Sequence, residues 1–140
     1  MSNEVGKNDK YHVIVKIASE AMKVAYVVYD KIIKAKTEII KEQKEIYLSA
    51  IDCKKAEINS LCDMYKDKDL SNSQMEKYRV EVREITNSII EINNEYDKKL
   101  QKREENQNKI LRQVIDNLTK LGVTGIIVYG VTFVAKTVKK

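Results

Sequence analysis

The 140-residue chain contains no proline and no tryptophan, and it has only one phenylalanine and four glycines. Proline is the residue that breaks a helix most strongly, so nothing in this sequence prevents long helices. Few aromatic residues and 34% charged residues leave little material for a thick globular core. Hydrophobic residues still make up 43% of the chain and recur at helical spacing, so we expect an ordered, all-α protein built from thin helical packing.

The residues that usually carry chemistry are also scarce. His12 is the one histidine, and it has no nucleophile beside it. On a continuous helix Cys53 and Cys62 would point about 180° apart and lie about 13 Å apart along the axis, so they would neither form a disulfide nor share a metal ion. Three of the four glycines lie at the end of the chain, so no glycine-rich phosphate loop is present. We therefore expect no enzyme activity, no catalytic residue, no metal site and no cofactor.

The apolar pattern predicts two long helices. One apolar stripe runs without a turn signal from Tyr11 to Tyr65, and a second runs from Ile85 to Leu118. Between them lies the polar run 66–74, in which Ser73 and Glu76 have the spacing of a capping box that opens a helix. We predict a single domain with a helix at 9–66, a turn at 67–74, a helix at 75–120 and an apolar C-terminal segment at 121–138.

Folding this rod back on itself near residue 70 gives an internal check. Paired positions then have numbers that add up to about 141. Apolar residues 46–65 face apolar residues 76–95, polar 34–44 faces polar 97–107, and apolar 11–33 faces 108–130. This match in all three zones predicts a long antiparallel two-helix hairpin that resembles a coiled coil.

The first helix carries more apolar residues than one partner helix can cover. Several lie off the main stripe near the open end of the hairpin, where the two ends of the chain meet. Such a surface has to be covered by self-association, by a partner or by lipid. The residues that we predict to make this contact are Val13, Ile17, Val24 and Val28.

The C-terminal segment is apolar and cationic. Residues 1–108 contain 20 basic and 20 acidic side chains, so the net charge of +5 comes from the last 32 residues. Residues 121–135 carry no formal charge, but as a helix they would be shorter than a bilayer core. Either they pack on residues 11–20 or they contact lipid, and Gly122 is a candidate C′ residue for the second helix. The membrane-contacting or packing residues that we predict here are Leu121, Ile127, Tyr129, Phe133, Lys136, Lys139 and Lys140.

These patterns favour a non-enzymatic assembly or scaffold protein that binds itself or another helical protein through the apolar open end of its hairpin. An anionic membrane surface is a further candidate partner for the cationic end. The first alternative is a membrane-active helical protein that forms pores or permeabilises bilayers. The second is a filament subunit of a secretion or phage system. We expect a cytoplasmic protein, with the inner face of a membrane as a candidate site. Nucleic acid is not an expected partner, because acidic residues dilute the basic run 98–112.

Overall fold

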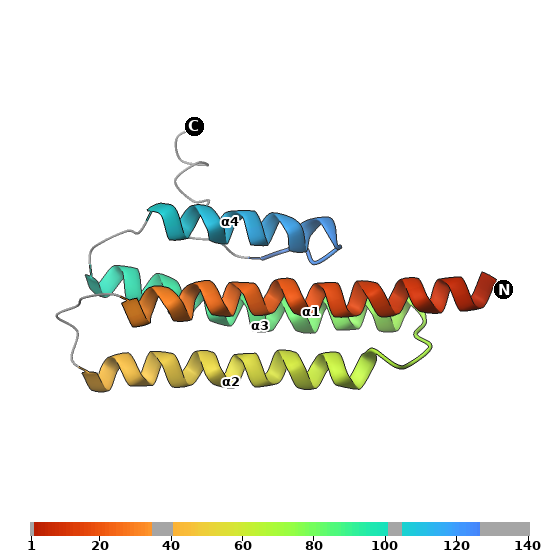
Figure 1. Ribbon diagram of the computed structural model, residues 1–140, viewed down its shortest axis with the longest axis horizontal. Coiled ribbons are helices and arrows are strands. Elements are labelled where there is room, and N and C mark those ends of the chain that lie inside the picture. Colours follow the sequence, from red (N-terminus) through yellow and green to blue (C-terminus); the bar gives the residue numbers. More distant parts are fainter. Residues whose placement is uncertain (1, 35–40, 101–104, 127–140) are drawn as a thin grey trace.

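The computed structural model describes residues 2–34, 41–100 and 105–126. Within these ranges it contains four helices and no strands: α1 (Ser2–Lys34), α2 (Lys41–Tyr65), α3 (Asn72–Leu100) and α4 (Glu105–Lys120). Each helix runs antiparallel to the one before it (Figure 1). α1 contacts all three other helices, and α2 also packs on α3. In Figure 1, α1 lies in front, with α2 below it, α4 above it and α3 behind it. The all-α prediction is confirmed.

Four helices stand where the sequence predicts two. α1 ends at Lys34 and α2 begins at Lys41, while α3 ends at Leu100 and α4 begins at Glu105. Both interruptions fall in the polar zones 34–44 and 97–107. An extended hairpin would place these zones against each other and bury little apolar surface. Folding the two apolar halves together instead covers several apolar residues of α1 that lie off its main stripe, among them Ile17, Val24 and Val28, and each buried aliphatic side chain contributes about 1.5–3 kcal/mol.

The central hairpin of α2 and α3 keeps the predicted register to within two residues. The rings of Tyr65 and Tyr78 lie 5.2 Å apart, and those of Tyr47 and Tyr96 lie 6.0 Å apart in an edge-to-face pair. These pairs join the two helices near both ends of the hairpin.

The capping box that opens α3 lies two residues before the predicted one. The Gln74 backbone N–H donates to Ser71 Oγ at 3.1 Å, and the Ser71 backbone N–H donates to Gln74 Oε1 at 2.8 Å. This reciprocal pair makes Ser71 the N-cap and places α3 from Asn72 onward. The prediction of Ser73 and Glu76 in this role is wrong, because the sequence offers the same spacing two residues earlier.

α1 buries an arc of about 160° around its axis, counted at about 100° per residue. This arc includes Ile17, Val24 and Val28, which are fully buried, while Val13 is half-buried against the core. The prediction that these four residues form a surface for a partner is therefore corrected for the three that are fully buried. α2, α3 and α4 cover α1 on three sides, so part of the apolar surface that one partner helix would leave open is buried within the chain, while Val15 and Ile33 stay exposed.

A buried polar cluster joins α1 to α3. Lys31 on α1 is 4% exposed and donates to Asn93 Oδ1 at 2.9 Å. It also forms an ion pair with Asp97, whose side chain is 12% exposed. In the first half of α1, the Tyr78 hydroxyl donates to the Ile14 carbonyl at 2.8 Å. These contacts fix the parallel register of α1 and α3.

α4 ends in a Schellman motif. Gly122 has φ 95°, its N–H donates to the Thr119 carbonyl at 3.0 Å, and the Val123 N–H donates to the Leu118 carbonyl at 2.9 Å. Leu118 and Val123 are both fully buried, which supplies the apolar contact of this motif. Gly122 is therefore the C′ residue that the sequence offered as a candidate. Leu121 and Ile126 pack against the core and are half-buried, so the described start of the C-terminal segment lies on the bundle.

Among the described helices, none combines the length and the apolar content needed to cross a bilayer.

Candidate interaction surface

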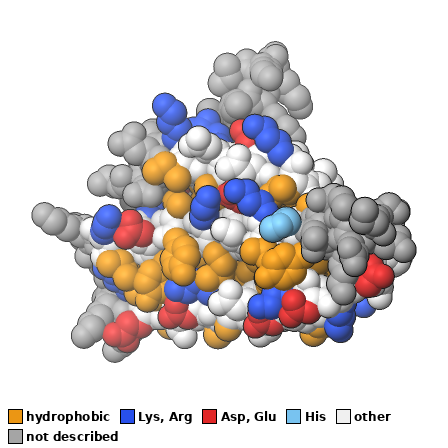
Figure 2. Space-filling view, turned by 45° about the vertical axis from the view of Figure 1, so that its right-hand side comes forward, with side chains coloured by type: hydrophobic (Ala, Val, Ile, Leu, Met, Phe, Trp, Pro, Cys, Tyr) orange, Lys and Arg blue, Asp and Glu red, His pale blue; other side chains and the backbone are white. Residues whose placement is uncertain are grey.

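The side of α1 that no other helix covers carries a row of apolar residues. At about 100° per residue, all of them fall within an arc of about 60°, and they extend over 22 residues, or about 33 Å of helix. Tyr26 is 55% exposed, Ile33 47%, Tyr11 40% and Val15 37%, while Met22 and Tyr29 are half-buried. Figure 2 shows hydrophobic side chains gathered in a band across this side of the molecule. We call this set the α1 outer row: Tyr11, Val15, Met22, Tyr26, Tyr29 and Ile33.

Lys55 of α2 holds part of the row in place. Its Nζ lies 4.5 Å from the ring centroid of Tyr29 and 5.1 Å from that of Tyr26. It also pairs with Asp52 at 3.0 Å. Cation–π contacts of this kind contribute about 0.5–1 kcal/mol at exposed sites. The two tyrosine rings therefore start from a restricted orientation, which lowers the entropy that a binding partner has to offset.

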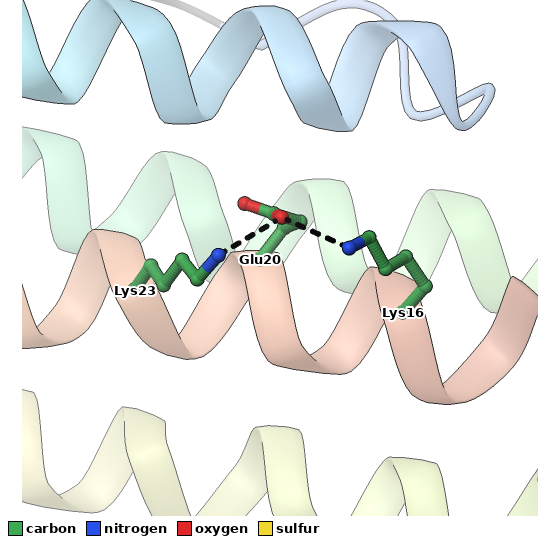
Figure 3. A network of polar contacts seen from close by, with 3 residues as sticks. All are labelled: Lys16, Glu20 and Lys23. Atoms are coloured by element: carbon green, nitrogen blue, oxygen red, sulfur yellow. Dashed lines mark hydrogen bonds and ion pairs between the residues drawn. The ribbon is translucent and has the colours of Figure 1, made fainter.

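Lysines flank the row on the side of α1 that faces α4. Figure 3 shows Lys16 and Lys23 reaching along the helix toward Glu20 from opposite directions. The Glu20 side chain is 2% exposed, and its Oε1 lies 3.2 Å from Lys23 Nζ and 3.9 Å from Lys16 Nζ. The two lysine side chains are 62% and 53% exposed, so each pair adds little stability. Their effect is on position: one buried carboxylate holds two cations beside the row and leaves a net charge of +1.

A second apolar surface lies on the outer side of α2 and α3. A shallow groove of about 520 Å³ is lined by the apolar residues Leu61, Met64 and Ile85 and by the carboxylates Glu57, Glu81 and Glu84. A second hollow of about 520 Å³ continues along α2 past Ile46, Ala50 and Cys53, with Glu45 at its edge. Ile46 is 66% exposed and Met64 is 55% exposed. We call the two hollows together the α2/α3 groove. Among the described residues that line it, the charged ones are all acidic.

The described groups with shifted pKa values, Cys62, Lys66 and Tyr78, lie at or next to the α2–α3 turn and line neither surface. Burial raises the pKa of Tyr78, and its contact with Cys62 raises it further. Burial also raises the pKa of the Cys62 thiol. A hydrogen bond to Asp63 raises the pKa of Lys66. Cys62 and Cys53 are free thiols. No cluster of three or more His, Cys, Asp or Glu side chains within the described ranges is placed to hold a metal ion.

The predicted site residues are divided by the structure. Ile17, Val24 and Val28 are core residues, and Val13 is partly covered. Leu121 lies with His12, Val15 and Ser19 around a hollow of about 440 Å³, so the start of the C-terminal segment does meet α1. The other predicted residues of the C-terminal segment lie outside the described residues: Ile127, Tyr129, Phe133, Lys136, Lys139 and Lys140.

The residues that the sequence offered for a partner surface and the outer row both lie on α1, but Ile17, Val24 and Val28 point into the core. The signal that marks the outer row was present in the sequence, since its six apolar residues share one narrow arc. Recognising it requires knowing which arc the other helices cover.

Comparison of the chain with protein-family models, curated proteins and solved structures found no match.

Proposed function

We propose that this chain is a non-enzymatic helical assembly protein that self-associates through the α1 outer row. The observation that carries the proposal is the row itself: six apolar residues, three of them tyrosines, within about 60° of one rigid helix. Tyrosine is enriched at protein interfaces because its ring buries a large apolar area while its hydroxyl tolerates water. A continuous apolar row of this length on a helix is the pattern by which helices bind grooves and other helices.

The size of the row sets the strength that we expect. A helix face about 33 Å long and about 10 Å wide covers roughly 330 Å² per partner, well below the roughly 800 Å² of a standard stable interface. Association should therefore be weak, with a Kd on the order of 100 μM or above. A concentration series has to reach about 1 mM to detect it.

Sedimentation velocity of wild type and two matched variants tests this proposal. Val15→Glu/Tyr26→Glu places two charges on exposed positions of the row, and Ile110→Glu places one on an exposed apolar position of α4 that is 45% exposed and outside the row. The weight-average mass of wild type should rise above 16.2 kDa with concentration, and Ile110→Glu should behave alike. The double variant should stay monomeric with an unchanged helical circular dichroism signal. A wild-type mass that stays constant up to about 1 mM would refute self-association.

An anionic membrane surface is the second candidate partner. The observation that favours it is the exposed lysines beside the row, because tyrosine and lysine together suit the boundary between headgroups and acyl chains. A cytoplasmic protein at the inner face of a membrane would meet such lipids, and the free thiols Cys53 and Cys62 are compatible with a reducing compartment. Flotation with vesicles of 30% phosphatidylserine tests this role. Vesicle binding that is lost in Val15→Glu/Tyr26→Glu would support it.

A membrane-active role would require α1 to leave the bundle and expose its buried arc. The fully buried set on α1 includes Ile14, Ile17, Val24, Val28 and Ile32. Exposing it to water on the way to lipid would cost about 1.5–3 kcal/mol per side chain. We therefore place this alternative below assembly. Dye leakage from the same vesicles would reverse that order.

A further inference from the structure

We infer that the occupant of the α2/α3 groove is the α1 outer row of a second copy of this chain, so that copies join head to tail. This inference rests on the proposed function, since it names the surface to which the row binds. The groove and the row are the two exposed apolar surfaces that extend along helices in the described part of the chain. Each needs a cover of opposite charge and similar length.

Charge decides whether the row of one copy packs on the row or on the groove of the next copy. The row is flanked by Lys16, Lys23 and Lys34, whose side chains are 62%, 53% and 71% exposed. Two rows packed on each other would bring lysines of both copies together, although Asp30 would offset part of this repulsion. The groove is instead lined by four carboxylates and by no basic side chain among the described residues. Two of the four, Glu57 and Glu84, are 50% and 66% exposed and pair at 3.0 Å with Lys54 and Arg83, which lie outside the lining. Placing the row in the groove therefore brings its lysines to an acidic lining instead of to the lysines of a second row.

Length and lining also match. The two hollows together extend along α2 from Ile46 to Met64, which is 18 residues or about 27 Å, against about 33 Å for the row. Both α2 and α3 line the part from Ala56 to Met64, and α2 alone lines the part from Glu45 to Cys53. The lining combines Leu61 and Ile85 with Met64, whose flexible side chain adapts to the ring shapes of Tyr11 and Tyr26. A helix lying in a two-helix groove is a common mode of helix recognition.

Geometry then decides the form of the assembly. α1 packs on α2 and α3 through its buried arc, so its outer row and the outer side of α2 and α3 lie on different sides of one molecule. Each copy has one row and one groove. A contact between unlike surfaces leaves a free row at one end and a free groove at the other, so assembly continues as an open chain unless its rotation closes a ring. This agrees with the filament alternative that the sequence suggested.

Complementation of two variants tests the head-to-tail contact. Val15→Glu/Tyr26→Glu makes the row acidic and leaves the groove intact. Glu57→Lys/Glu84→Lys makes the groove basic and leaves the row intact. Each variant alone should be monomeric at about 1 mM, because its altered surface repels the unaltered one of the next copy. An equimolar mixture should assemble again, because an acidic row meets a basic groove and a basic row meets an acidic groove. Raising NaCl from about 0.05 M to about 0.5 M should weaken wild-type assembly several-fold.

Met64→Glu provides a second groove variant, and circular dichroism melts show that each variant folds. Assembly of wild type together with full assembly of both groove variants would overturn the head-to-tail inference and leave the proposed function standing. A mixture that stays monomeric would also overturn it. A wild type that remains monomeric would overturn the proposed function itself, and vesicle binding by that monomer would assign the row to lipid.

Discussion

Lys31 is the residue whose replacement gives the sharpest test of the packing of α1 on α3. It is almost fully buried, donates to Asn93 Oδ1 at 2.9 Å and pairs with Asp97. Lys31→Met keeps an unbranched apolar side chain, shorter by one heavy atom, and removes the charge. It leaves the Asn93 oxygen, in a residue 1% exposed, without its donor, at a cost of about 1–3 kcal/mol. It also removes the cation beside Asp97, and breaking a buried pair costs up to about 3–5 kcal/mol.

Because Asp97 is 12% exposed, water can relieve part of that second cost. We expect a total loss of about 3 kcal/mol, which lowers the Tm of a chain of this length by about 10 °C. Urea unfolding followed by circular dichroism measures the free energy of unfolding. The matched control is Lys34→Met, three residues along α1, whose pair with Asp30 has side chains that are 71% and 50% exposed. Its loss should stay within about 0.5 kcal/mol. Equal losses for the two variants would show that Lys31 is not buried against α3.

Three further changes test the turn, the end of α4 and the buried tyrosine. Ser71→Ala should lower stability by about 1 kcal/mol in urea unfolding, and Ser73→Ala should change it little, because only Ser71 caps α3 in the structure; the reverse order would restore the capping box predicted from the sequence. Gly122→Ala should cost more than about 1 kcal/mol, since φ is 95° and a Cβ would lie 2.7 Å from Arg79 Nε; an unchanged melting temperature would contradict the Schellman end. Burial raises the pKa of folded Tyr78 above the unfolded value near 10. The contribution of Tyr78 to the free energy of unfolding is therefore fully present below pH 10, and it is lost as the pH rises from 10 toward the folded pKa. Tyr78→Phe should lower the free energy of unfolding by about 1 kcal/mol at pH 7. Above pH 10, the stability of this variant should fall less steeply with pH than that of wild type, as measured by urea unfolding at a series of alkaline pH values.

Local signals in the sequence were enough for the helical class and for the central hairpin. The spacing of apolar residues fixed α2 against α3, and the tyrosine pairs Tyr65–Tyr78 and Tyr47–Tyr96 lie close to the predicted register. The cap was displaced by two residues because 71–74 and 73–76 both satisfy the same motif. The two-residue offsets of the cap and of the hairpin register both arise within residues 41–100.

The folding of the rod into four helices could not be read from periodicity. Helical spacing continues through residues 34–44, so local pattern gave no reason to stop the first helix there. The reason is a long-range one: α1 has apolar residues on too wide an arc for one neighbour. The sequence showed that excess, but its cover could be another molecule or another part of the same chain. In the structure, other helices of the same chain cover Ile17, Val24 and Val28.

For the same reason, the candidate surface in the structure differs from the one predicted from the sequence. Once α2, α3 and α4 take the wide arc, the apolar residues left over are those of the outer row, among them Tyr26 and Ile33. The acidic groove could not be predicted either, because its two sides come from α2 and α3 and only the hairpin register places Glu57 and Glu84 on one groove.

The central claim is that the α1 outer row is covered by a second copy in solution. A dilution series of ¹⁵N-labelled protein from about 1 mM to about 20 μM, followed by amide chemical shifts, tests it at the level of single residues. We predict concentration-dependent shifts at Val15, Tyr26 and Ile33 and, in the same series, at Met64 and Ile85, with the core residues Ile17 and Val28 changing little. Spectra that do not change over this range, or changes confined to α4, would contradict the account.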